Sequence, residues 1–441
     1  IPEPVKAYTC AKRLSGRGKF QVLVQKSLTE LQGREQETRQ LTALWRQAVA
    51  GESAAISLAG EGGIGKTRLV LDVSNQLLEQ GGERHLIECS PFHQGSYLFP
   101  IISYLESKFE FFDSESPEQK YNKLISGLAD YECADAECLA LLGSLLAVDK
   151  ARLPPLDYTP RRQRELTHEA LISLIREDAA RNPCFYIFDD LHWCDPSTLE
   201  FLSMLIREKV PGTLFAMTFR PGFEHRWEGT SHIELGQISV AEAEGIVRST
   251  DRLGMLDDET VREIVARSDG IPLFLEELTQ AVLSQQQSVS ADNKPAQIQI
   301  PSSLRDSLFA RLDRLPSGKK IAQLAAVIGR DFSQEMLGVI WAGRDEDLQT
   351  GLHELTGSGL LEQHRNDRQL FYTFKHALIR DTAYESLLIR RRQQYHLLIA
   401  YKIESRFVHM KTSQPEVLAH HFTAGLEYKK ALEYWRKSSS R

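Results

Sequence analysis

One eight-residue segment constrains this chain more than any other: residues 60–67 read G-E-G-G-I-G-K-T. The segment fits G-x-x-x-x-G-K-[ST], a loop whose glycines let successive backbone N–H groups surround phosphate oxygens. An apolar run over residues 54–59 precedes it, and a helix-like pattern over 67–78 follows it. This strand–loop–helix order predicts a P-loop that binds the phosphates of a nucleotide.

The residues of this loop have separate expected tasks. Lys66 would reach the β- and γ-phosphates, and the hydroxyl of Thr67 would bind Mg²⁺. The partial positive charge at the start of the following helix favours the same anions. The predicted cofactors are therefore ATP or ADP with Mg²⁺. The loop residues expected to contact them are Gly60, Gly62, Gly63, Ile64, Gly65, Lys66, Thr67 and Arg68.

A second apolar run, over residues 184–188, ends in two carboxylates, Asp189 and Asp190. A P-loop needs an acid on a neighbouring strand to hold its metal ion, and Asp189 would hold Mg²⁺ through water. Asp190 is the candidate for polarising the attacking water, and the alternative is that it belongs to an exposed acidic turn. Because aspartate is a shorter base than glutamate, we expect slow hydrolysis.

Strand-like runs alternate with helical patterns between residues 51 and 235, which indicates an α/β domain with a parallel sheet. Several runs are continuously apolar, as expected for strands that are buried on both faces. A long helical stretch over about 95–180 separates the second run from the third. The predicted strands cover residues 54–59, 85–89, 184–188, 213–219 and 232–235.

Four further regions are expected around this P-loop NTPase domain. A helical run followed by two strand-like runs, at 360–363 and 370–373, suits a winged helix, and the last fifty residues resemble one tetratricopeptide (TPR) unit. The predicted bounds are a tail or linker at 1–28, the P-loop domain at 29–236, a helical domain and linker at 237–299, the winged helix at 300–390 and the TPR-like helical region at 391–441.

Composition excludes some classes of protein. The net charge is −7, so the chain has no bulk electrostatic footprint for nucleic acid. Six cysteines without a C-x-x-C pair favour free thiols in a reducing compartment, and we expect a cytoplasmic location.

No apolar run is long enough to predict a membrane span, and no signal peptide is visible. Because the chain starts at Ile1 and ends in a helical pattern, we expect it to be a piece of a longer protein.

Residues 189–195 read D-D-L-H-W-C-D. This run resembles the signature of the STAND class of signalling ATPases, nucleotide switches in which a winged helix and a repeat sensor follow the P-loop domain. The resemblance extends from about residue 30 to residue 440. It implies a role for His192 beside the nucleotide, for which the alternative is a structural histidine.

Four more segments are similar to marks of this class and occur in the expected order. The resemblance places Arg34, in G-R-E, near adenine and ribose, and Arg220, in T-F-R-P, where it senses the γ-phosphate. It places Pro272, in G-I-P-L-F, against the adenine, and His376, in F-K-H-A-L, on the β-phosphate of ADP, where it ties the winged helix to the closed state. The alternatives are a surface arginine for Arg220, a helix breaker for Pro272 and a core histidine for His376. With Arg220 included, the predicted catalytic residues are Lys66, Asp189, Asp190 and Arg220.

A narrower resemblance concerns residues 89–100 and 1–8. Residues 89–100 resemble a segment found in STAND modules behind class III adenylate or guanylate cyclase domains, and residues 1–8 resemble the last strand of such a domain. The resemblance therefore implies a cyclase domain before residue 1, although its catalytic residues are not in this chain.

The resemblance predicts a regulatory ATP/ADP switch with slow hydrolysis, closed by ADP and opened by exchange for ATP. Its expected partners are nucleotide, other copies on activation, and a protein or small-molecule inducer bound by the C-terminal repeats. One alternative is a DNA-binding initiator or transcription regulator of the AAA+ type. Residues 300–390 argue against it, because twelve basic and twelve acidic residues leave them without net charge. The other alternative is a scaffold that binds nucleotide without hydrolysis.

Overall fold

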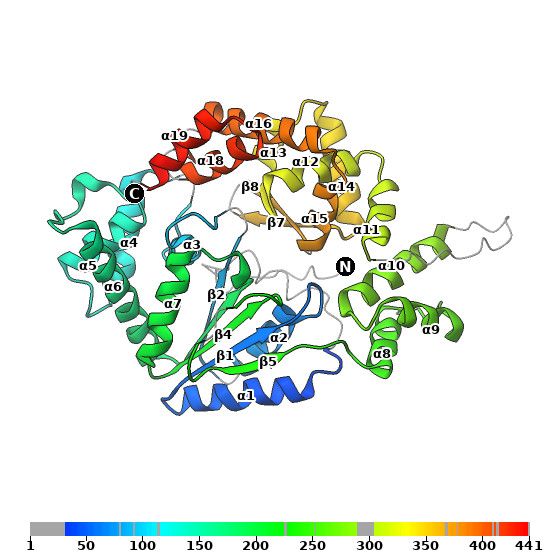
Figure 1. Ribbon diagram of the computed structural model, residues 1–441, viewed down its shortest axis with the longest axis horizontal. Coiled ribbons are helices and arrows are strands. Elements are labelled where there is room, and N and C mark those ends of the chain that lie inside the picture. The colour runs from blue at the N-terminus through cyan, green and yellow to red at the C-terminus, as the bar shows by residue number, and fades with distance from the viewer. Residues whose placement is uncertain are drawn as a thin grey trace, which may run out of the picture.

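The computed structural model shows two sheets joined and flanked by helices (Figure 1). The predicted tail at 1–28 and the predicted phosphate contact of His376 lie outside the described residues. The structure describes residues 31–78, 81–90, 93–112, 115–224, 227–251, 253–288, 304–366, 369–375, 377–407, 410–411 and 414–439.

The first sheet has five strands in the order β2-β3-β4-β1-β5, and every neighbouring pair is parallel. The central strands β3 and β4 are buried along their whole length, which explains their apolar sequences. All five predicted strands are confirmed. Their bounds are β1 Ser53–Ala59, β2 Glu83–Glu88, β3 Cys184–Asp189, β4 Thr213–Phe219 and β5 Ser231–Glu234.

Helices cover both faces of this sheet. One face packs on α1 and α2, where Trp45 stacks on Phe185 at 5.8 Å between ring centroids. The other face packs on α7 and on helices of the long insertion, which is the segment α3–α6 between β2 and β3. We call residues 31–236 the P-loop unit. Its helices are α1 Glu35–Val49, α2 Lys66–Leu78, α3 Phe99–Lys108, α4 Pro117–Leu128, α5 Ala136–Leu145, α6 Pro160–Arg181 and α7 Pro196–Glu208, with short 3₁₀ turns at Lys150–Arg152 and Leu191–Trp193.

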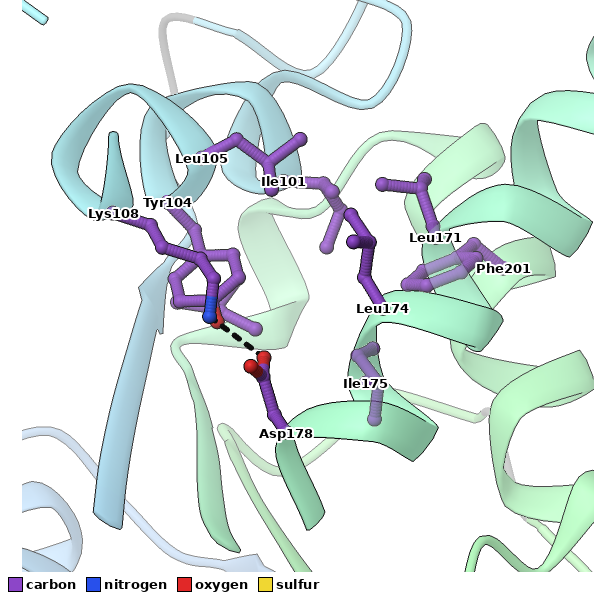
Figure 2. Close-up of a pocket in the computed structure, with 10 residues that line it drawn as sticks. Ile101, Tyr104, Leu105, Lys108, Leu171, Leu174, Ile175, Asp178 and Phe201 are labelled. Carbon is purple, nitrogen blue, oxygen red and sulfur yellow. Dashed lines mark hydrogen bonds and ion pairs between the residues drawn. The ribbon is translucent and has the colours of Figure 1, made fainter. Parts of the chain in front are cut away.

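The insertion contains a small cavity between α3, α6 and α7 (Figure 2). Its volume is about 10 Å³, which is room for a single water. Lys108 and Asp178 form an ion pair of 2.7 Å at its edge, and the hydroxyl of Tyr131 donates to the same carboxylate. The paired charges explain how Asp178 is tolerated in the core, and the size of the cavity excludes a nucleotide there.

Three helices with their own apolar core follow the first sheet. This three-helix unit consists of α8 Val240–Thr250, α9 Asp258–Arg267 and α10 Pro272–Ser288. Within the predicted region 237–299, polar composition places the start of the linker at Ser284, but helix α10 continues to Ser288. The run Gln285-Gln286-Gln287 is helix-compatible, so polarity alone did not mark the end of the helix. Residues 289–299, the rest of the predicted linker, lie outside the described residues.

The second sheet has three antiparallel strands in the order β6-β8-β7. The predicted strand pair is confirmed as β7 Leu361–Asn366 and β8 Gln369–Phe374, whereas β6, Asp331–Ser333, is too short to leave a periodic pattern. We call residues 304–387 the second-sheet unit. Its helices are α11 Leu304–Asp313, α12 Gly318–Ile328, α13 Gln334–Ile340, α14 Asp345–Gly357 and α15 Ala377–Glu385.

Three C-terminal helices share one continuous core with the second-sheet unit. They are α16 Ile389–Arg406, α18 Pro415–Ala424 and α19 Tyr428–Ser439. Phe422 and Tyr434 stack at 5.7 Å between α18 and α19. None of the described helices is both long and apolar enough to cross a membrane.

Candidate nucleotide-binding site

The P-loop curves around the ammonium group of Lys66. The Nζ atom donates to the carbonyl oxygens of Gly60, at 2.7 Å, and Glu61, at 3.0 Å. Gly63 and Gly65 have φ values of 85° and 99°, a region that favours glycine, so the sequence of the loop matches its backbone. Burial lowers the pKa of Lys66, while the charges of Asp190 and Asp189 act in the opposite direction.

The two residues that the sequence predicts to bind Mg²⁺, Thr67 and Asp189, lie in contact. The Thr67 hydroxyl donates to both carboxylate oxygens of Asp189, at 2.8 and 3.0 Å. Thr218 donates to the same carboxylate at 2.5 Å. Burial, followed by the charge of Asp190, raises the pKa of Asp189 to about 6, and the two threonine hydrogen bonds oppose this shift. A divalent cation would relieve the same crowding of negative charge.

Asp190 occupies a constrained turn directly after β3. Its φ of 57° is left-handed, and its N–H donates to the Thr218 hydroxyl at 3.0 Å. His192 Nδ1 lies 3.8 Å from Asp190 Oδ1. Burial, with the positive charges of Arg220 and Lys66, lowers the pKa of His192 to about 4, so the ring is neutral at pH 7. The turn therefore gathers a carboxylate and a neutral imidazole beside the P-loop.

Arg220 reaches this site from the end of β4. A Cβ atom placed on Gly62 would lie 3.8 Å from the guanidinium carbon of Arg220. The arginine also acts electrostatically on Lys66 and His192. Its planar set of donors suits phosphate oxygens, and the guanidinium lies beside the P-loop.

The three-helix unit covers one side of the P-loop with the start of α10. The N–H of Leu273, next to Pro272, donates to the Gly63 carbonyl at 3.3 Å. A Cβ on Gly63 would lie 3.1 Å from Leu273 Cβ, so the two backbones approach closely. Arg68 pairs with Glu276 at 2.8 Å, which fastens α2 to α10.

Arg34 is buried between protein groups. Its Nη2 donates to the Gly236 carbonyl at 2.7 Å and to the Ile64 carbonyl at 3.5 Å, and its Nη1 pairs with Glu37 at 3.1 Å. These contacts brace the P-loop against the segment after β5. No pattern in the sequence anticipates this brace.

Sequence reasoning missed Arg330, which enters the site from the second-sheet unit. Its Nη1 lies 4.0 Å from Oε1 of Glu88. Glu88 pairs with Asp189 in the register of β2 and β3, so both acids end at the same edge of the sheet. Burial opposes the charge of Arg330, but the carboxylates of Glu88, Asp331, Asp189 and Asp190 outweigh it and raise the pKa of the arginine. Arg330 follows an ordinary helix, and no pattern in its own segment points to the P-loop.

The assembled residues fit a nucleotide with Mg²⁺. The loop offers a glycine-lined backbone, an ammonium group and a nearby guanidinium, which are the donors that phosphates require. Among the described residues, no three His, Cys, Asp or Glu side chains gather as metal ligands. Mg²⁺ at a nucleotide needs only one or two protein oxygens, because phosphates and waters supply the rest, so Thr67 and Asp189 suffice.

Comparison with known proteins agrees with this geometry. Residues 30–215 match the AAA ATPase domain family. An uncharacterized protein of Rhizobium meliloti (strain 1021) is 26% identical over 381 residues, which cover 82% of this chain and 36% of that protein.

One solved structure shows the same fold. A signal transduction ATPase with numerous domains (STAND) from Pyrococcus horikoshii, which has a tetratricopeptide repeat sensor, matches with a TM-score of 0.52 at 13% identity. The match covers 91% of this chain and 49% of that one, so the chain spans less than half of either relative. The ORC1 protein of Aeropyrum pernix, solved in complex with DNA, reaches a TM-score of 0.36 at 14% identity, covering 83% of this chain and 95% of that one.

The family match, the parallel sheet and the P-loop geometry agree with one another. Similarity to the AAA ATPase domain family implies nucleotide binding. Residues 30–215 of this chain match the AAA ATPase domain family, and the described chain has the fold of a P-loop ATPase, which it shares with a STAND protein.

Proposed function

We propose that the chain is the ATP/ADP-binding switch module of a multidomain signal-transduction protein. The P-loop unit and the three-helix unit hold the nucleotide, and the second-sheet unit acts as a winged helix that closes over it. The observation that carries this proposal is the position of Arg330, which belongs to the second-sheet unit and acts on the acids at the end of β2 and β3.

Arg330 couples the second-sheet unit to the ligand in the nucleotide site. Its guanidinium and a Mg²⁺ ion compete for the charge of the same carboxylates, Asp189 and Asp190. Binding of one therefore weakens binding of the other, and this coupling is reciprocal. A nucleotide that binds without drawing Mg²⁺ to Asp189 leaves the closed contact intact.

Arg220 supplies the discrimination between ATP and ADP. The two nucleotides differ by one phosphate, and Arg220 lies over the P-loop where an extra anionic group adds a charge-assisted hydrogen bond. A ligand can shift a conformational equilibrium only through such a difference in contacts. ADP therefore favours the closed arrangement, and ATP favours the open one.

Hydrolysis in this proposal is slow and resets the switch. Asp190 is the base, and its short side chain projects from a left-handed turn that Thr218 fixes through the N–H. Proton transfer needs the base within hydrogen-bond reach of the water, which an aspartate achieves less readily than a glutamate. A scaffold that binds nucleotide without turnover is the second candidate, and turnover measurements separate the two.

Further parts of the proposal concern the longer protein. The C-terminal helices begin a TPR-like sensor for a protein or small-molecule inducer, activation leads to self-assembly, and the protein is cytoplasmic. A class III cyclase domain before residue 1 is the proposed output. A DNA-binding role is disfavoured, because residues 300–390 carry equal numbers of basic and acidic groups.

The test is the nucleotide content of the purified chain. We expect tightly bound ADP in the parent chain and its loss in Lys66→Ala, because the ammonium group would contact the β-phosphate. Lys320→Ala, which removes an exposed lysine of α12, is the matched control and should keep its ADP. A parent chain that is empty and binds neither ADP nor ATP would refute the switch.

A further inference from the structure

Four histidines gather outside the nucleotide site, where the C-terminal helices meet the P-loop unit. His93 lies in the loop between β2 and α3, His396 on α16, and His420 and His421 on α18. The ring centroids of His396 and His420 are 5.7 Å apart, and those of His420 and His421 are 5.6 Å apart. His93 acts electrostatically on His421, and His420 acts on His93, so all four form one group, the histidine cluster.

The cluster lies on a contact between separate parts of the chain. The segment after His93 packs on α19, since a Cβ placed on Gly95 would lie 3.2 Å from the ring of Trp435. The ring of His93 itself stacks on Phe99 at 3.4 Å between centroids. Separation of the C-terminal helices from the P-loop unit would therefore remove His93 from beside His420 and His421 and open this side of the histidine cluster to water.

The proton arrangement inside the cluster is restricted by geometry. Nδ1 of His396 and Nδ1 of His421 are 2.8 Å apart, so one of them donates and the other accepts. Nε2 of His396 also lies 3.0 Å from the hydroxyl of Tyr384. If both imidazoles were protonated, two N–H groups would face each other, and the hydrogen bond would become a repulsion.

The surroundings of the cluster disfavour added positive charge. His396 and His421 are each 1% exposed. Within the described part of the chain, neither ring nitrogen of His93 has a hydrogen-bond partner. Burial, then the charge of Arg380 on α15, lowers the pKa of His420. The other titratable or charged groups around the cluster are Tyr384 and Asp381 on α15, Arg392 on α16, which lies over the Tyr384 ring, and Glu416, one turn before His420 on α18.

We propose that the histidine cluster is a proton-sensitive contact, which holds the C-terminal helices on the P-loop unit when neutral and releases them when protonated. Burial lowers the pKa of His93 and of His396 to about 3 in the closed arrangement. An exposed histidine titrates near its ordinary value of about 6.5. The closed arrangement is therefore fully stable above that value and loses stability as the pH falls through it.

The size of the effect follows from the number of histidines that gain a proton on opening. Each one favours the open arrangement by about 11-fold at pH 5.5 and by about 1.1-fold at pH 7.5. Each therefore shifts the open-to-closed ratio by about 10-fold between these two pH values, and two shift it by about 100-fold.

Hydrogen exchange of the full chain tests the proposal without any nucleotide, so its failure is distinct from failure of the switch proposed above. The protection of residues 93–98 and 427–439 is measured at pH 7.5 and 5.5 and corrected for the intrinsic pH dependence of amide exchange. The variant His396→Gln/His421→Gln removes two titratable rings but keeps polar side chains. His353→Gln, which changes an exposed histidine of α14, is the matched control.

We expect the parent chain and His353→Gln to lose protection in both segments at pH 5.5. If both rings gain a proton on opening, the loss of protection between pH 7.5 and pH 5.5 should be about 100-fold smaller in the double variant than in the parent chain. Equal protection of the parent chain at both pH values, or a double variant that follows the parent chain, would overturn the proposal. If circular dichroism shows the double variant unfolded at pH 7.5, the single variant His93→Gln takes its place, with an expected difference of about 10-fold and the same contrary outcomes.

Discussion

At the scale of single residues, the site is held by a few hydroxyl and carboxylate contacts. Thr218 is central, because its hydroxyl donates to Asp189 and accepts the N–H of Asp190. Thr67 completes the support of Asp189 from the P-loop side. The chemistry of the predicted nucleotide site therefore depends on a threonine that no motif marks as catalytic.

Asp190→Asn tests the proposed base. We expect turnover of ATP to fall by at least 100-fold, since amide nitrogen and oxygen cannot accept the proton of water, while binding of ADP stays within a few-fold. The comparison is a steady-state phosphate-release assay beside a binding titration, with Asp345→Asn on the exposed start of α14 as the control. Turnover equal to that of the parent chain would show that Asp190 is not the base.

Thr218→Val tests the support of the two acids at nearly constant volume. The substitution leaves the half-buried Asp190 N–H and one oxygen of the buried Asp189 without this hydroxyl, which should cost about 1–3 kcal/mol of stability. Urea unfolding measures the loss, and Thr350→Val, which removes an exposed hydroxyl that bonds within α14, should change little. An unchanged unfolding midpoint for Thr218→Val would mean that water replaces the hydroxyl without loss.

The sequence predicts the residues that lie next to each other along the chain better than those that do not. The P-loop motif identified Lys66 and Thr67, and the end of an apolar strand identified Asp189, because local pattern and site coincide there. Arg330 could not be found in this way. Its approach to Glu88 depends on how the second-sheet unit packs on the first sheet, and side-chain patterns do not encode that packing locally.

At the scale of elements, long periodic patterns were predictive, and short or polar segments were not. The five parallel strands and the hairpin of β7 and β8 follow directly from their apolar runs. Strand β6 has three residues, and only its pairing with β8 makes it a strand. Helix α10 extends through a polar stretch, because helix propensity and polarity are different properties.

An ion pair between α10 and α11 links the three-helix unit to the second-sheet unit. Glu277 and Arg311 are 3% and 11% exposed, and their charged groups are in direct contact. Arg311→Met would leave a buried carboxylate without its partner, which should lower stability by about 3–5 kcal/mol.

The double variant Glu277→Leu/Arg311→Met should recover most of that loss, because it removes both buried charges. Urea unfolding of the two variants gives the comparison. Arg344→Met, which breaks an exposed pair with Asp347, is the control and should have little effect. A double variant that is no more stable than Arg311→Met would show that the loss comes from packing of the arginine stem.

At the scale of the whole molecule, one site is built from three units. The P-loop unit supplies the loop and the acids, the start of α10 covers Gly63, and the second-sheet unit contributes Arg330. Figure 1 shows the second sheet facing the first across the molecule, with α10 and α11 on one side. The proposed switch depends on this arrangement, because a change of nucleotide would alter the contact between Arg330 and the acids of the P-loop unit.

The most direct measurement of this central claim is the radius of gyration of the chain in solution, by small-angle X-ray scattering, with ADP and with a non-hydrolysable ATP analogue plus Mg²⁺. We predict a compact chain with ADP and a larger radius with the analogue. Arg330→Ala should show the larger radius with either nucleotide, whereas the control Arg344→Ala, at an exposed site of the same unit, should behave like the parent chain. An identical radius in both nucleotide states, with binding of both verified, would contradict the account.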